Sequence, residues 1–317
     1  MIKPFLVNLF FKKPGRARSD NDSHGTAEGS ALFRYLASRE KDAAVRGGDR
    51  LARHFLGPGL RLSGLCPPVA RRLGEYANPG AYHYVNARTR HIDRLLRTAL
   101  QEEPEQVVLL GAGYDTRPLR FSEELRHSRV YEVDFPGTQA RKRDLLARAN
   151  LAVPSNLTFV PLDFNTRSLE QSLPAAGFQK GARTFFIWEG VSFYLTPAAV
   201  DRVLRFVSGT SAPGSSIVFD YVLGSFVRGE NLSRRAAKSA ACHRRLGEPY
   251  VMGLPDEGLT DFLAGRGLFP ISHLGPPELN RTYLRRSNGR PHGRVFDYIH
   301  IVQAGVASGS SSQNQAY

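Results

Sequence analysis

The chain has 317 residues, of which 41% are hydrophobic, so it can bury a full core and is not disordered as a whole. Its 43 basic and 29 acidic residues give a net charge of +14, which by itself would suggest a nucleic acid or an anionic surface as partner. The excess lies in the flanks, because residues 1–100 carry 18 basic and 8 acidic residues, residues 101–220 carry 13 and 14, and residues 221–317 carry 12 and 7. We therefore expect no nucleic-acid partner, and the flanks either attract an anionic substrate or form solvated helix faces.

The cysteines and the N-terminal residues narrow the cellular setting. Cys66 and Cys242 lie far apart and have no partners at metal-ligand spacing, which predicts neither a disulfide framework nor a zinc site and favours a reducing, cytoplasmic compartment. Residues 4–11 form an apolar run that is too short to span a bilayer, and two lysines follow it. The run is either a frayed or self-packing segment or a membrane-surface anchor, and we expect no stable membrane insertion.

The first hundred residues change from a polar segment to helices. Residues 12–29 are polar, contain glycine and show no apolar periodicity, so residues 1–29 are predicted to be a flexible N-terminal segment. Apolar residues at helical spacing follow at residues 30–38, 49–55 and 87–99. The region before the first strand is therefore predicted to be largely helical.

From residue 106 the chain alternates between short apolar runs and helix-length stretches. The predicted strands are residues 107–110, 130–133, 157–162, 185–188 and 217–219. Helices are expected between them, notably at residues 138–149 and 197–208, and Thr196 would cap the second of these. Alternation of this kind predicts a parallel sheet covered by helices on both faces, with ligands bound at the carboxyl ends of the strands.

The chain after the fifth predicted strand shows weaker signals. A basic stretch has no strand pattern, and it is followed by one predicted helix and two late strands, at residues 228–245, 257–264, 269–274 and 295–302 respectively. Residues 305–317 are rich in serine, glycine and glutamine, which predicts a disordered tail. One domain over residues 30–304 is therefore expected between two flexible ends.

A glycine-rich turn follows the first predicted strand directly. Gly111 and Gly113 allow a tight turn and a close approach of the backbone to a ligand. Asp134 ends the second predicted strand, 21 residues beyond Gly113, where a carboxylate can accept both hydroxyls of a ribose. The combination predicts a site for a cofactor that contains adenosine.

The residues after Gly113 separate the possible cofactors. A pyrophosphate needs a helix N-terminus with positive potential, but Tyr114 and Asp115 follow here, and Thr116 replaces the third glycine of a dinucleotide fingerprint. The charge of Asp115 suits the sulfonium and ammonium groups of S-adenosylmethionine better than phosphate, although Asp115 could equally cap a helix. S-adenosylmethionine is thus favoured over NAD.

The turn and the second predicted strand together resemble one family. The motifs GAGYDTR at residues 111–117 and VYEVDFP at residues 130–136, followed by Lys142, resemble the leucine carboxyl methyltransferases, which use S-adenosylmethionine. That family includes protein phosphatase methyltransferases and bacterial O-methyltransferases of secondary metabolism, and the resemblance covers roughly residues 26–302. We accordingly expect an α/β fold with a doubly wound, Rossmann-like, mainly parallel sheet, an antiparallel last strand, and a helical cap from residues 30–100 and 221–255.

The resemblance also implies which residues hold the cofactor, most of them at the ends of predicted strands. They are Arg88 for the carboxylate, Gly111 and Gly113 for backbone contacts, Asp134 for the ribose, Asp163 and Phe164 for the adenine, and Glu189 for the ammonium group. Tyr194 lies just beyond Glu189 and is a candidate catalytic residue.

Most of these assignments have a purely structural alternative. Arg88 could be a surface helix residue, Asp163 could cap a turn, and Tyr194 could be a core aromatic residue with a satisfied hydroxyl group. Glu189 is harder to explain in this way, because a single carboxylate in an apolar run is costly to bury unless it is paired.

Methyl transfer from a sulfonium is an in-line displacement that depends on alignment and desolvation, so no metal ion is expected. A carboxylate acceptor is already ionised near neutral pH, whereas a hydroxyl would be helped by a base such as Tyr194 or His243. We predict an S-adenosylmethionine-dependent O-methyltransferase acting on a carboxylate or hydroxyl of a small molecule, in secondary metabolism. The alternatives are methylation of a protein C-terminal carboxylate and, from another class, a nucleotide- or nucleic-acid-binding module.

Overall fold

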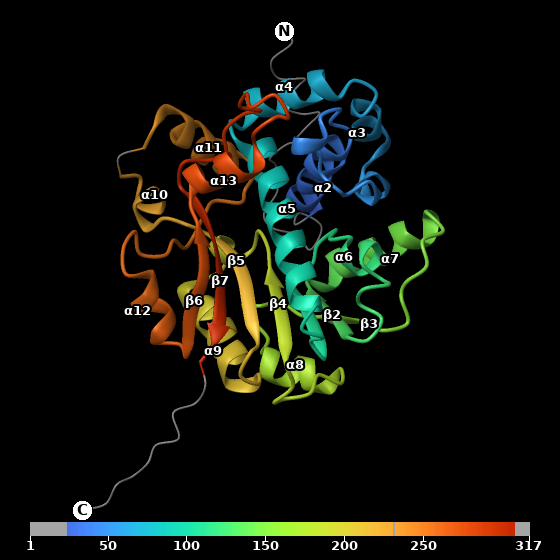
Figure 1. The fold of residues 1–317 in the computed structure, drawn as a ribbon, viewed down its shortest axis with the longest axis vertical. Coiled ribbons are helices and arrows are strands. Elements are labelled where there is room, and N and C mark those ends of the chain that lie inside the picture. The colour runs from blue at the N-terminus through green and yellow to red at the C-terminus, as the bar shows by residue number, and fades with distance from the viewer. Residues whose placement is uncertain (1–23, 231, 308–317) are drawn as a thin grey trace, which may run out of the picture.

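The computed structural model describes residues 24–230 and 232–307 and has a seven-stranded sheet at its centre (Figure 1). The strands are β1 (Gln106–Leu110), β2 (Arg129–Asp134), β3 (Leu157–Pro161), β4 (Thr184–Trp188), β5 (Ser216–Val222), β6 (Leu268–Leu274) and β7 (Ile299–Val306). They lie in the order β3-β2-β1-β4-β5-β7-β6. Neighbours among β1 to β5 pair in parallel, whereas β7 runs antiparallel to β5 and β6. The predicted mainly parallel sheet with an antiparallel last strand is confirmed.

Helices cover both faces of the sheet and also gather beyond the carboxyl ends of its parallel strands (Figure 1). The α-helices are α2 (His24–Ser38), α3 (Pro58–Ser63), α4 (Pro67–Ala77), α5 (Ala81–Leu100), α6 (Arg117–Arg120), α7 (Pro136–Arg148), α8 (Leu169–Ala175), α9 (Pro197–Thr210), α10 (Gly224–Arg228), α11 (Arg234–Arg245), α12 (Leu259–Ala264) and α13 (Pro276–Tyr283). Short 3-10 helices are η1 (Ala43–Val45), η2 (Leu51–Phe55) and η3 (Ser192–Tyr194). None of the helices in the described ranges is long and apolar enough to cross a membrane.

Each strand contributes to two separate cores, one on each face of the sheet. Val107 and Leu109 of β1 pack into the core that contains α5, whereas Val108 and Leu110 pack into the core that contains α8 and α9. Successive side chains of a strand point to opposite faces, so a strand buried on both faces consists of a continuous apolar run. This is why β1 and β4 are readable in the sequence as apolar stretches, and why the interiors of β2 and β5 are apolar apart from Glu132 and Asp220.

The last strand is displaced from its expected position. It occupies Ile299–Val306 instead of residues 295–302, because Val295 and Phe296 are buried under the helices without joining the sheet. Residues 305 and 306, expected in the tail, are the last two residues of β7.

The N-terminal boundary also differs from the expectation. α2 already begins at His24, although helix was expected only from residue 30. The expectations for residues 1–23 and 308–317 lie outside the described residues.

Candidate functional site

The glycine-rich turn after β1 lies against the neighbouring segments of the sheet. Gly111 and Gly113 have φ angles of +68° and +49°, a region that glycine adopts without steric strain. The Gly111 N–H donates to the Val133 carbonyl at 2.7 Å, and a side chain at position 111 would overlap with Val191. Position 111 therefore requires glycine, because its backbone is wedged between the end of β2 and the segment after β4.

Asp134, the last residue of β2, faces this turn. Its carboxylate accepts hydrogen bonds from the N–H group of Gly113 and, at 2.6 Å, from that of Phe135. Burial raises the pKa of Asp134, and these two hydrogen bonds oppose the shift. The residue predicted to bind a ribose thus lies directly beside the predicted turn.

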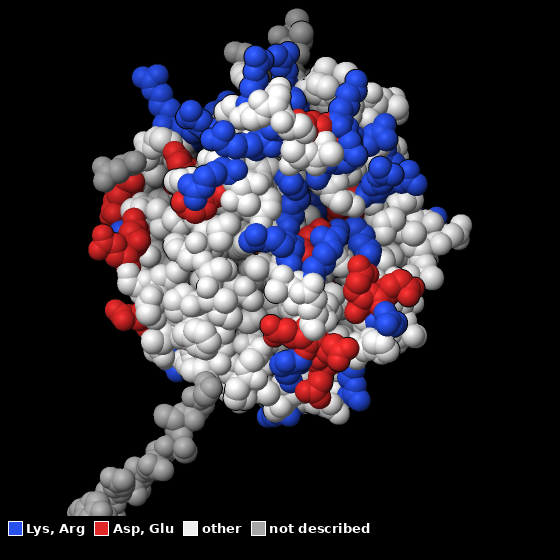
Figure 2. Space-filling model, in the orientation of Figure 1, with Lys and Arg blue, Asp and Glu red and all other residues white. Residues whose placement is uncertain are grey.

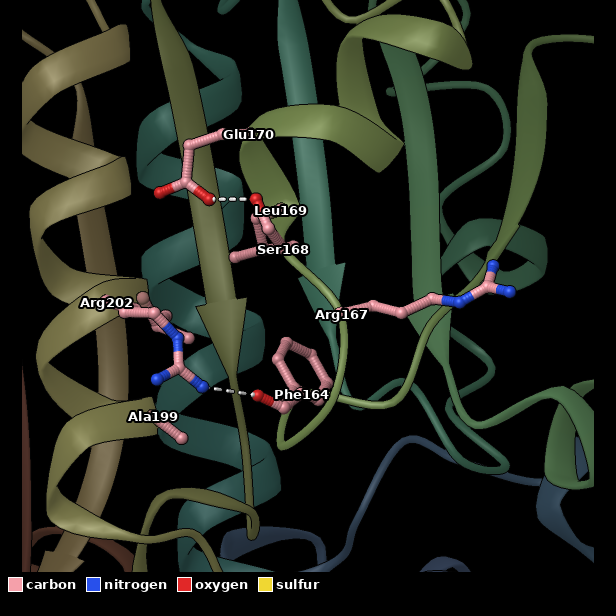
Figure 3. A pocket seen from close by; sticks show the side chains of 8 residues that line it. Phe164, Arg167, Ser168, Leu169, Glu170, Ala199 and Arg202 are labelled. Carbon is pink, nitrogen blue, oxygen red and sulfur yellow. Dashed lines mark hydrogen bonds between the residues drawn. The ribbon is translucent and has the colours of Figure 1, made fainter.

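The loop after β3 carries the two residues predicted to contact an adenine. Asp163 accepts a hydrogen bond from the Asn165 N–H at 2.9 Å, so it does cap a turn. Phe164 lines a shallow hollow between this loop and α9, and Arg202 of α9 donates to its carbonyl at 3.1 Å (Figure 3). Both predicted residues are partly exposed at the carboxyl edge of the sheet.

Arg88 and Glu189 meet at the carboxyl end of β4. Arg88 is buried in α5, where its Nε donates to Glu189 Oε1 at 2.9 Å and its Nη1 to Asp220 Oδ2 at 2.7 Å. Asp220 of β5 is fully buried, and its Oδ1 accepts from the Gly190 N–H at 2.6 Å. Burial disfavours the charge of Arg88, but the two carboxylates outweigh this effect and raise its pKa. Arg88 is therefore not a surface helix residue.

A second buried arginine, Arg117, connects Glu189 to the glycine-rich turn. Its Nη1 lies 2.7 Å from Glu189 Oε2 and also contacts the Asp115 carboxylate, while its Nε donates to Asp93 at 2.8 Å. Burial would raise the pKa of Asp115, but Arg117 and Arg34 lower it to about 2. Because these cations compensate the charge of Asp115, this residue is a weaker argument against phosphate than the sequence suggested. Asp115 also accepts from the Arg117 N–H at 2.7 Å, at the start of α6.

Lys142 links the two motifs GAGYDTR (residues 111–117) and VYEVDFP (residues 130–136). From α7, its buried Nζ lies 2.7 Å from both carboxylate oxygens of Glu132 and donates to the Asp115 carbonyl at 2.6 Å. Burial raises the pKa of Glu132 to about 7, and Lys142 opposes this shift. The lysine thereby ties the second strand to the glycine-rich turn.

Tyr194 lies beside α11, at the end of η3. Its hydroxyl is 3.3 Å from Nδ1 of His243, whose Nε2 lies 2.9 Å from the Tyr250 hydroxyl and 3.2 Å from Nδ2 of Asn78. Burial raises the pKa of Tyr194 well above its ordinary value and lowers the pKa of His243 to about 4. Both side chains are therefore uncharged at neutral pH.

The prediction from sequence missed Asp220, Arg117 and Asp93. Asp220 was detectable, because it is a single carboxylate in an apolar run, which is the same argument that selects Glu189. Arg117 and its partner Asp115 stand inside the GAGYDTR motif, but its other partners, Asp93 and Glu189, lie elsewhere in the chain. Asp93 sits on an amphipathic helix with other charged residues and carries no comparable signal.

Across residues 24–230 and 232–307, no group of three or more His, Cys, Asp or Glu side chains is arranged to hold a metal ion.

Comparison with known proteins places this geometry in context. The family model of the leucine carboxyl methyltransferases matches residues 27–208. YktD of Bacillus subtilis (strain 168), assigned as an S-adenosyl-L-methionine-dependent methyltransferase, is 33% identical over 218 residues, which cover 69% of this chain and 71% of YktD. A protein of Mycobacteroides abscessus with the same assignment is 31% identical over 279 residues, covering 79% and 87%. The solved structure of a protein of Thermobifida fusca YX, assigned as a methyltransferase, has a TM-score of 0.53 at 16% identity and covers 88% of this chain and 94% of that chain.

The fold and these relatives together define an S-adenosylmethionine-dependent methyltransferase. More particularly, the chain belongs to the leucine carboxyl methyltransferase family, whose model matches more than half of it. The predicted class of enzyme and the predicted cofactor are confirmed.

Proposed function

We propose that this methyltransferase acts on a carboxylate oxygen of a small organic molecule. The proposal is carried by the Tyr194–His243 pair, both members of which are uncharged at neutral pH. A tyrosine with a raised pKa stays protonated, so it can donate a hydrogen bond to a carboxylate but is a poor base. A carboxylate acceptor needs no base, because it is already ionised.

The hydrogen bonds of His243 support this role for Tyr194. Nδ2 of Asn78 can only donate, so Nε2 of His243 accepts and Nδ1 carries the proton. Nδ1–H then donates to the Tyr194 oxygen, which leaves the phenolic proton of Tyr194 available for the methyl acceptor. Tyr194 is thus a hydrogen-bond donor that orients the acceptor, and a hydroxyl acceptor would lack a matching base in this pair.

The charges of Arg88 and Glu189 fit S-adenosylmethionine, which supplies an electrophilic methyl group on its sulfonium. Arg88 retains N–H groups beyond those given to Glu189 and Asp220, so it can take the carboxylate of the cofactor while Glu189 takes the ammonium group. The remaining contacts that we propose are Asp134 to the ribose, Gly111 and Gly113 through their backbone, and Asp163 and Phe164 to the adenine. These roles agree with the family resemblance of the motifs.

Aromatic rings surround Tyr194 and favour an acceptor with an apolar or aromatic body. The Tyr194 ring lies 4.8 Å from Phe193 and 5.5 Å from Tyr250, and Tyr250 is 5.5 Å from Phe226. Such a lining excludes water, which assists a displacement whose charge is dispersed in the transition state. An organic acid of secondary metabolism, methylated in the cytoplasm, is the acceptor class that this lining and the family resemblance support.

A product assay tests the proposal. The full-length protein is incubated with S-adenosylmethionine labelled in its methyl group and with matched panels of carboxylic acids and phenols, and each product is then treated with mild alkali. We expect labelled methanol, because alkali hydrolyses methyl esters but not methyl ethers. Tyr194→Phe removes one hydrogen bond to a charged acceptor and should lower kcat by about 10–100-fold at unchanged cofactor affinity. Tyr131→Phe, which changes a buried tyrosine on the opposite face of the sheet, should have no effect on kcat.

Three outcomes would contradict the proposal. Alkali-stable label would identify a hydroxyl acceptor, and alkali-labile label found only on added protein would identify a protein carboxylate. Full activity of Tyr194→Phe would remove the assigned donor. Separately, Asp134→Ala should weaken binding of S-adenosylmethionine in isothermal titration, and an unchanged affinity would show that the ribose contact is wrong.

A further inference from the structure

Helices α3 and α4 and the turn between them carry exposed apolar side chains. Leu62, Leu65, Val69 and Tyr76 are 64%, 81%, 52% and 57% exposed, and we call these four residues the α3–α4 face. Val69 and Tyr76 are seven residues apart and therefore lie on one side of α4, whereas Leu62 lies in α3 and Leu65 in the turn that joins the two helices. Single exposed apolar residues are ordinary on soluble proteins, but a contiguous group marks a contact with something apolar.

Basic side chains surround the α3–α4 face. Arg61 and Arg72 are exposed on the same helices, and the neighbouring α11 adds exposed Arg234, Lys238, Arg244 and Arg245. Lys238 binds the two helices together, since its Nζ lies 4.2 Å from the centre of the Tyr76 ring. The one acidic residue of residues 58–77 is Glu75, which accepts a hydrogen bond from the Gly80 N–H, and α11 has none. Figure 2 shows Lys and Arg gathered over the part of the molecule where Figure 1 places α4, α11 and α13.

We propose that the α3–α4 face docks reversibly on an anionic lipid surface. Apolar side chains at the centre of a basic ring match a bilayer interface, where acyl chains lie beneath negatively charged head groups. A nucleic acid would neutralise the arginines but would leave Leu65 in water. The lipid surface is therefore the partner that satisfies both the apolar centre and the basic ring.

Charge also argues against two other occupants of this face. Residues 1–18 contain Lys3, Lys12, Lys13, Arg16 and Arg18 and no acidic residue, so this segment is repelled by the basic ring. A second copy of the chain would bring two such rings together. Residues 4–11 are apolar except for Asn8 and are flanked by Lys3, Lys12 and Lys13, so this segment would add to lipid binding.

The inner sides of the same helices lie at the acceptor end of the site. Asn78, which ends α4, contacts His243 of α11 at 3.2 Å and accepts a hydrogen bond from Ser239 at 2.7 Å. A docked bilayer would therefore lie beside the Tyr194–His243 pair. This consequence for the acceptor rests on the proposed function, whereas the docking itself does not.

Vesicle flotation tests the docking with the full-length protein. We expect binding to vesicles of phosphatidylcholine and phosphatidylglycerol in equal parts, little binding to phosphatidylcholine alone, and release at high salt. Leu65→Ser with Val69→Ser should lower the partition coefficient about tenfold. The matched control, Val153→Ser with Ile271→Ser, removes two exposed apolar side chains outside the α3–α4 face and should leave the partition coefficient unchanged.

A second pair of substitutions separates charge from apolar area. Arg72→Gln with Arg244→Gln, both at exposed positions, should weaken binding to anionic vesicles while leaving the melting temperature and the affinity for S-adenosylmethionine unchanged. Equal binding by the Leu65→Ser, Val69→Ser protein and its control would overturn the proposal. It would also be overturned by binding to RNA that is as tight as binding to vesicles and insensitive to the serine substitutions, or by dimerisation that these substitutions abolish.

Discussion

Ion pairs between buried side chains hold the candidate site together. Arg117 lies among Asp93, Asp115 and Glu189, and Arg88 links Glu189 to Asp220. Removing one partner of a buried pair leaves the other charge uncompensated and costs about 3–5 kcal/mol. Substitutions at these positions therefore change folding and cofactor binding together. The glycines of the turn are better probes, because they carry no charge.

Gly111→Ala and Gly113→Ala should differ in their effect on cofactor binding. At position 111 the new methyl group overlaps with Val191 and φ is +68°, so the turn must move. At position 113 the nearest atom is Ala27 Cβ at 3.7 Å, and only the strain of a positive φ remains, about 1–2 kcal/mol. Isothermal titration should show S-adenosylmethionine binding lost in Gly111→Ala and retained in Gly113→Ala. Equal affinities would mean that the turn is not wedged against Val191.

At the scale of elements, the parallel order of the strands assembles the site. The carboxyl ends of β3, β2, β1 and β4 lie side by side, so residues that are far apart in the chain reach one edge of the sheet. Helices α5 and α6 then contribute Arg88 and Arg117 from the side of the cofactor turn. Capping hydrogen bonds at helix N-termini contribute to the stability of the helices that flank this edge.

The N-cap of α9 offers a test at this scale. Thr196 accepts a hydrogen bond from the Ala199 N–H at 3.2 Å, as the sequence predicted, whereas Ser168 at the N-cap of α8 makes no capping bond. Thr196→Ala should therefore lower the free energy of unfolding in urea by about 1 kcal/mol. Ser168→Ala should change it by less than about 0.5 kcal/mol. The capping assignment fails if the two variants lose the same stability.

For the whole molecule, buried histidines should make stability depend on pH. Burial lowers the pKa of His91 and His243 to about 4 and that of His83 to about 3, from an ordinary value of 6.5. Between these values the unfolded chain binds more protons, so the free energy of unfolding falls as pH drops from 6.5 towards 4. Burial raises the pKa of Glu132 to about 7 and also raises the pKa of Asp134 and Glu75, which act in the opposite direction. His300, with its pKa lowered to about 4, acts in the same direction as the other histidines.

Urea unfolding at pH 7 and pH 5 checks this dependence, and we expect a loss of a few kcal/mol at the lower pH. His243→Gln should reduce the difference between the two pH values, because it removes one of the buried imidazoles. His127→Gln, at an exposed position on the surface, is the control and should leave the difference unchanged. Equal stability at both pH values would contradict the burial of neutral histidines.

The sequence by itself determined the architecture and most of the predicted site. Strands buried on both faces appear as continuous apolar runs, and the residue after each run must lie at the carboxyl edge of a parallel sheet. Gly111, Asp134, Asp163 and Glu189 were therefore placed at one edge without any knowledge of tertiary contacts. The placement of Arg88 relied on the family resemblance, since a helix pattern alone does not show which face is buried.

Only the tertiary structure decided which polar side chains meet. Arg117 pairs with Asp93 across 24 residues and Arg88 with Asp220 across 132, and Tyr194 reaches His243 across 49. Local periodicity carries no information on such contacts, because they depend on how helices cross the sheet edge. The last strand was misplaced for a related reason: Val295, Phe296 and Tyr298 belong to the core under the helices, and burial alone does not distinguish that role from pairing in the sheet.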